Sequence, residues 1–204
     1  MNTTALRSHR LLRALLVAVA GAALPLTALA HAEHGQAVGL LAGLSHPISG
    51  WDHVLAMVAV GLWGAVLGAP ALWILPVAFP VMMAVGGLLG LLGIPVPGVE
   101  IGIALSAIVL GGVVLAQIRP SLALATALVA IFAIFHGHAH GTELPDGGNG
   151  LLYSLGFVIA TGLLHGVGIV IGEAKRWGFG QRIIRAAGGG VAAAGLFFLW
   201  RAVA

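Results

Sequence analysis

Residues 121–143 read SLALATALVAIFAIFHGHAHGTE, an apolar segment that ends in three histidines and a glutamate. A helix needs about 20 consecutive apolar residues to cross the hydrocarbon core of a bilayer, and this segment is long enough. Similar apolar segments recur along the chain, which has 204 residues, of which 60% are hydrophobic and only 7% are charged. Soluble domains carry about a quarter charged residues. The sequence therefore predicts an all-α polytopic membrane protein.

Six apolar segments have about the length of a transmembrane helix, and short polar or proline-containing breaks separate them. They lie at residues 51–69, 71–94, 99–117, 121–140, 150–173 and 183–203. Glycine pairs recur inside these segments, where small residues allow two helix backbones to approach closely. We therefore expect most of the glycines to serve helix packing.

Residues 1–30 have the features of a secretory signal peptide, with arginines first, then a short apolar run and a small-residue sequence that ends at Ala30. Cleavage there would leave residues 31–204 as a six-span permease domain; an uncleaved anchor helix is the alternative. If the mature chain starts outside, the loops around Arg119 and Lys175 fall inside, as the positive-inside rule requires. We expect both mature termini on the periplasmic side of a bacterial cytoplasmic membrane.

The charge distribution and the absence of cysteine exclude several classes of function. The formal net charge is +3, but three arginines fall within the first 13 residues, and the rest of the chain is balanced. A surface that binds nucleic acid is therefore not expected. The chain has no cysteine, which excludes disulfides, thiolate metal sites and cysteine nucleophiles.

The first of two polar clusters is HPISGWDH at residues 46–53. Its proline and glycine predict a broken or late-starting helix, with Asp52 and His53 in the first turns and His46 just before them. Ionisable groups at membrane depth are costly and are therefore functional candidates. Asp52 could bind a metal ion itself, or it could orient a histidine by accepting a hydrogen bond.

The second polar cluster lies at the end of the segment quoted above. His136 and His140 are four residues apart on one helix face, Glu143 continues that face, and His138 points elsewhere. Two imidazoles and a carboxylate suit Ni²⁺, Co²⁺, Cu²⁺ or Zn²⁺, whereas Mg²⁺ and Ca²⁺ prefer oxygen ligands. In the predicted topology both clusters reach the outer face, so we expect them to form one metal-handling site.

Four further histidines are weaker candidates for metal binding, and His138 is one of them because it points away from the face of His136. His165 lies inside the segment 150–173, ~15–22 Å below the outer boundary by helix rise. It is either a deeper relay ligand or a core histidine bonded to a neighbouring carbonyl. His31 and His34 lie at the predicted mature N-terminus, where they either capture metal or belong to a solvated tail.

The two clusters, HPxxGxDH at residues 46–53 and FHGxAHGxE at residues 135–143, together resemble the motifs of the HupE/UreJ family of nickel/cobalt permeases. The resemblance covers the whole mature chain. It implies secondary uptake of Ni²⁺ or Co²⁺ to supply metalloenzymes, with the ion as cargo rather than a permanently bound cofactor. The transport residues that it implies are His46, Asp52, His53, His136, His140 and Glu143.

Two other classes of protein use the same residue types. An intramembrane zinc hydrolase would use three histidines and a water, with Asp52 or Glu143 as general base. A haem-binding cytochrome would need histidines that face each other across the core. The residues favour the permease, whose partners are the metal ion and the bilayer; a homo-oligomer is compatible with the sequence. They do not distinguish nickel from cobalt.

Overall fold

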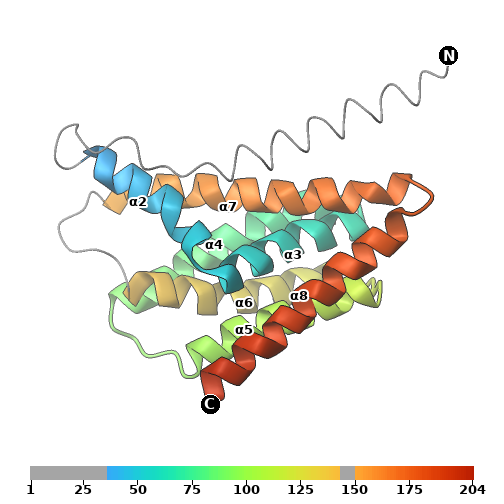
Figure 1. Ribbon diagram of the computed structural model, residues 1–204. Helices are drawn as coiled ribbons and strands as arrows, with labels where there is room; N and C mark the ends of the chain where they lie inside the picture. Colours follow the sequence, from blue (N-terminus) through green and yellow to red (C-terminus); the bar gives the residue numbers. More distant parts are fainter. Residues whose placement is uncertain (1–35, 143–149) are drawn as a thin grey trace. The chain divides into compact units, whose positions relative to one another are not determined.

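The computed structural model describes residues 36–142 and 150–204, and within these ranges all regular structure is helical. Figure 1 labels the helices in chain order. They are α2 (Gln36–Ser49), α3 (Trp51–Leu67), α4 (Ala71–Leu91), α5 (Val99–Leu115), α6 (Leu122–Thr142), α7 (Gly150–Gly172), the short 3₁₀ helix η1 (Glu173–Arg176) and α8 (Gly180–Val203).

Each of the six predicted segments overlaps one of the helices α3 to α8, with ends that agree within three residues, which confirms the all-α class. By length and composition α4, α6, α7 and α8 can each cross a membrane, and α2 with α3 makes a fifth candidate if the bent pair is one span. The apolar helix α5 has 17 residues and is shorter than those four helices. The six-span count and the orientation remain predictions, and the predicted signal peptide lies outside the described residues.

The helix α2 is absent from the sequence prediction, although the break that follows it was expected. The axes of α2 and α3 differ by 83°, and the bend falls at Gly50, whose backbone is extended. This confirms the predicted broken helix. The position of α2 depends on tertiary contact, because α2 packs along α7, where a side chain at Gly43 would overlap the backbone of Tyr153.

The helix α3 lies at the centre of the packed helices, in contact with α4, α5 and α7 (Figure 1). Every residue from Ala56 to Val66 is buried, with the exception of Val58. A helix that is hydrophobic on all sides is expected in such a position. Around it, α4 pairs with α6 and α5 pairs with α8.

Glycines form the closest helix contacts, as the sequence analysis predicted. A Cβ atom at Gly86 of α4 would overlap the carbonyl oxygen of Ile134 in α6. A Cβ atom at Gly61 of α3 would overlap the carbonyl oxygen of His165 in α7. Not every glycine has this role, since Gly112 has open space where its Cβ would lie.

The C-terminal end of α3 contacts a lysine of η1, which lies between α7 and α8. The Nζ atom of Lys175 donates a 2.6 Å hydrogen bond to the carbonyl oxygen of Ala65, in the last turn of α3. Lys175 also forms a 3.3 Å ion pair with Glu173, which pairs in addition with Arg176. These contacts hold η1 against the end of α3.

Candidate metal centre

Four histidines from three helices come together where the end of α2 and the start of α3 meet the end of α6. The ring centroids of His53 and His140 are 4.5 Å apart, those of His46 and His140 are 4.7 Å apart, and those of His53 and His136 are 4.8 Å apart. We call these four residues the histidine cluster. The structure therefore brings together the two sequence motifs, which are more than 80 residues apart in the chain.

The bend at Gly50 is what allows both histidines of the first motif to reach α6. His46 lies in the last turn of α2, and His53 lies in the first turn of α3. In one straight helix these residues would be two turns apart, about 10 Å along the axis. Across the bend, both rings instead pack against the ring of His140.

Asp52 fixes the orientation of His53. The Nδ1 atom of His53 lies 2.8 Å from Oδ1 of Asp52, and the same oxygen accepts the backbone N–H of His53 at 2.9 Å. A carboxylate can only accept, so Nδ1 carries the proton and Nε2 carries the lone pair. This Nε2 atom is buried and has no hydrogen-bond partner among the described residues. The arrangement matches the second role considered for Asp52, that of orienting a histidine.

Ser106 of α5 fixes the orientation of His136 in the same way, and the sequence analysis did not identify it. The hydroxyl of Ser106 donates its proton to the carbonyl of Ile103 at 2.6 Å. It must therefore accept from Nε2 of His136, which lies 2.9 Å away. The lone pair of His136 is then on Nδ1, which is buried and has no partner in the described part of the chain. A single serine inside an apolar segment was the only sequence signal.

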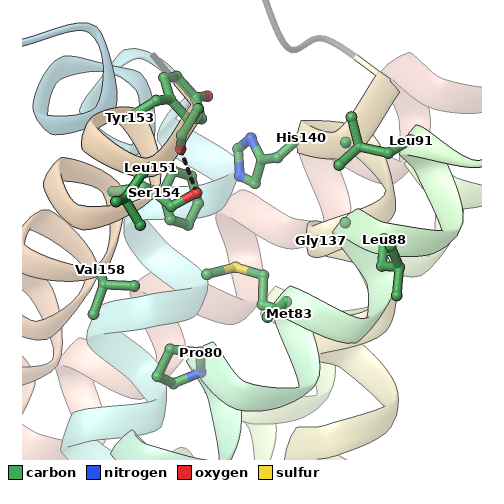
Figure 2. Close-up of a pocket in the computed structure, with 15 residues that line it drawn as sticks. Pro80, Met83, Leu88, Leu91, Gly137, His140, Leu151, Tyr153, Ser154 and Val158 are labelled. Atoms are coloured by element: carbon green, nitrogen blue, oxygen red, sulfur yellow. Dashed lines mark hydrogen bonds between the residues drawn. The ribbon is translucent and has the colours of Figure 1, made fainter. Parts of the chain in front are cut away.

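His140 lies between the other rings of the cluster and has neither nitrogen paired within residues 36–142 and 150–204. Its ring packs on Phe157 of α7 at 4.6 Å, and a cavity of about 550 Å³ reaches it from between α4, α6 and α7. Figure 2 shows His140 projecting from α6 into this cavity, with Tyr153 and Ser154 of α7 across from it.

The histidine cluster therefore contains a set of buried nitrogens that protein groups do not satisfy. Buried polar atoms almost always have a partner, so several unpaired nitrogens in one cluster need an explanation. The lone pairs of His53, His136 and His140 could bind a borderline divalent cation. The rings pack edge-on or tilted, and no three described histidine, aspartate or glutamate side chains form a ready metal-binding group. Metal binding would thus require side-chain rotation.

Comparison with known proteins identifies the family. The family model described as HupE / UreJ protein matches residues 16–198. The chain belongs to the HupE/UreJ family. Protein HupE of Rhizobium leguminosarum bv. viciae is 49% identical to this HupE/UreJ member over 179 residues, covering 87% of this chain and 94% of the relative. No solved structure gives a significant match. The resemblance that the two motifs suggested is thereby confirmed.

The remaining predicted residues of this HupE/UreJ member lie apart from the cluster or outside the described ranges. The Nε2 atom of His138 lies 2.9 Å from the carbonyl oxygen of Ile94, and this exposed contact agrees with the helix geometry that separated His138 from its neighbours. His165 is buried deeper along α7. Glu143, His31 and His34 lie outside the described residues.

Proposed function

We propose that this protein is a secondary permease that takes up Ni²⁺, Co²⁺ or both across the cytoplasmic membrane, with the histidine cluster as its entry site. The observation that carries the proposal is the set of unpaired, buried imidazole nitrogens on His53, His136 and His140. Membership of the HupE/UreJ family supports the same function. In this proposal the metal ion is cargo, and the protein is not an enzyme.

The chemistry of the cluster suits partial replacement of the hydration shell of the ion. Neutral imidazoles supply affinity for a borderline cation, and Asp52 offsets part of the divalent charge through His53. Glu143 is proposed as a further ligand on the sequence motif. Ligation has to remain incomplete, because an ion held by a closed set of ligands would not move on. An inside-negative potential favours entry by about 2.3 kcal/mol per charge per 100 mV.

The proposed topology has six spans, a signal peptide cleaved after Ala30 and both mature termini outside. It places the histidine cluster at the periplasmic face, where an ion arrives from outside the cell. In this arrangement α5 is a short span, and α3 crosses the membrane below the bend at Gly50. No observation on the described residues favours the zinc-hydrolase alternative.

The test is uptake of radioactive Ni²⁺ and Co²⁺ by cells that lack their own transporters. These cells would express the wild type, His53→Ala or His138→Ala, with membrane insertion verified for each. We expect uptake above the vector level for the wild type and for His138→Ala, and loss of uptake for His53→Ala. His138 is a matched control because its imidazole is bonded outside the cluster. An inserted wild type that moves neither ion would contradict the proposal.

A further inference from the structure

A fifth histidine, which is buried, lies deeper in the helix assembly than the cluster. His165 of α7 is 1% exposed, and neither of its ring nitrogens has a hydrogen-bond partner in residues 36–142 and 150–204. Its backbone contacts Gly61 of α3, which is eight residues, or about 12 Å of helix, beyond His53. Buried ring nitrogens usually have a hydrogen-bond partner, so a buried imidazole without one is a candidate for binding a ligand.

A second unpaired polar group lies on the same face of α7. Thr161 is one helical turn before His165, is 0% exposed, and its hydroxyl has no partner among the described residues. Residues four apart in a helix share a face. These two polar side chains therefore lie one above the other in the apolar interior.

A third polar group comes from the backbone of α4, which contains Pro76 and Pro80. In a regular helix the carbonyl of residue 76 would accept from the N–H of residue 80, but proline has no N–H. The carbonyl of Pro76 is therefore free of its helical donor, and it lies close enough to His165 to interact with the imidazole. The imidazole of His165 thus has a backbone oxygen beside it and the hydroxyl of Thr161 one helical turn away.

The aromatic ring of Phe79 links this interior group to the histidine cluster. Its centroid lies 5.5 Å from that of His136 and 5.5 Å from that of His165. Phe79 itself is fully buried. Phe79 therefore contacts both the histidine cluster and the level of His165.

We propose that His165, the hydroxyl of Thr161 and the carbonyl of Pro76 form a second, interior site that receives the divalent cation from the histidine cluster. This inference rests on the proposed function. The ion would keep some water ligands, since the protein offers one imidazole and two neutral oxygens. None of these three groups is a carboxylate, so we expect weaker binding there than at the cluster, where Asp52 contacts His53. Weak interior binding is what onward movement requires.

The first experiment uses Thr161→Val, which removes the hydroxyl and keeps the shape of the side chain. An unpaired buried hydroxyl contributes nothing to stability, so a structural role predicts an unchanged or higher melting temperature and unchanged transport. The interior site predicts instead a several-fold lower maximal rate of Co²⁺ uptake, with KM within twofold of the wild type and no loss of melting temperature. Thr126→Val, in the first half of α6, is the matched control and should transport as the wild type does.

Two further variants test the other groups of the interior site. Pro80→Ala restores an N–H donor to the carbonyl of Pro76 and should also lower the maximal rate. His165→Ala should lower it at least tenfold. Equilibrium binding of Ni²⁺ to the purified full-length protein in lipid nanodiscs should show a weak class of site in His53→Ala that disappears when His165→Ala is added.

The outcomes separate the two proposals. If the wild type transports the ion and both Thr161→Val and His165→Ala keep its maximal rate, the interior site is overturned. The permease proposal then still stands. If His165→Ala does not fold, Thr161→Val decides by itself. A wild-type protein that neither binds nor transports Ni²⁺ or Co²⁺ would overturn both proposals together.

Discussion

Asp52 holds Nδ1 of His53 at 2.8 Å through a carboxylate oxygen, and this contact decides which nitrogen of the imidazole is available to a ligand. The two residues are adjacent in the sequence, so the bond forms within the first turn of α3. It leaves Nε2 of His53 without a hydrogen-bond partner among the described residues, on a ring that packs against those of His136 and His140. In the proposed metal site the carboxylate would act on the ion through the histidine, by orienting the ring and increasing its basicity.

We predict that Asp52→Asn weakens metal binding by about 10- to 100-fold, the usual effect of losing an orienting partner of a metal-binding histidine. The amide removes the negative charge and no longer fixes the proton on Nδ1. Folding should change little, because the side chain of Asp52 is 27% exposed. Titration of the purified protein with Co²⁺ measures the affinity, and thermal unfolding provides the control. An affinity within twofold of the wild type would contradict the orienting role.

We predict that Ser106→Ala also weakens metal binding, by about tenfold, because it releases the proton of His136 from Nε2. The lost hydrogen bond should lower the free energy of unfolding by about 1 kcal/mol. Nitrogen-15 spectra of histidine-labelled protein should show one tautomer of His136 in the wild type and a mixture in the variant. A single unchanged tautomer in Ser106→Ala would rule out this role for the hydroxyl.

Gly86→Ala should destabilise the protein by about 1–3 kcal/mol, the usual range for overpacking. Its new methyl group would overlap the backbone of Ile134 and push α4 away from α6. Gly112→Ala is the matched control, because the new methyl group would lie in open space there. That substitution should also gain helix propensity. Melting temperatures in one detergent compare the two variants. Equal values for both would mean that close approach of α4 and α6 adds little to stability.

Lys175→Met should lower the free energy of unfolding by about 1 kcal/mol, because it leaves the carbonyl of Ala65 without its donor at the end of α3. The apolar stem of methionine keeps much of the packing of the lysine. Metal affinity at the histidine cluster should be unchanged, since the cluster lies at the other end of α3. Arg185→Met, which replaces an exposed cation of α8, is the control for the change in net charge. A cost no larger than that of the control would show that the hydrogen bond is not stabilising.

The sequence predicted the helices well because the hydrophobicity of each apolar segment is a local property of its own residues. It favours transfer of that segment from water to an apolar environment. The break at Gly50 was also local, since proline and glycine disfavour a continuous helix. The helix α2 was not predicted because its position depends on contact with α7, where Gly43 and Gly156 allow the two backbones to meet. Such contacts join residues more than 100 positions apart, and composition does not reveal them.

The candidate site could be predicted in its residue types but not in its hydrogen bonds. Helix periodicity placed His136 and His140 on one face, and both are buried, whereas His138 faces elsewhere. Periodicity could not show that Ser106 of α5 meets His136, or that the ring nitrogens of His165 have no hydrogen-bond partner among the described residues. Both depend on how separate helices pack against each other.

By itself the sequence determined the all-helical membrane class, the two histidine motifs at helix ends and the family to which the chain belongs. These follow from hydrophobicity, helix period and residue identity, which act over one or two turns. The tertiary structure decided which nitrogens of His53 and His136 are left unpaired, and that His165 lies one aromatic ring away from the cluster. Hydrogen bonds and ring contacts act over a few ångströms, so only the packing of distant segments can set them.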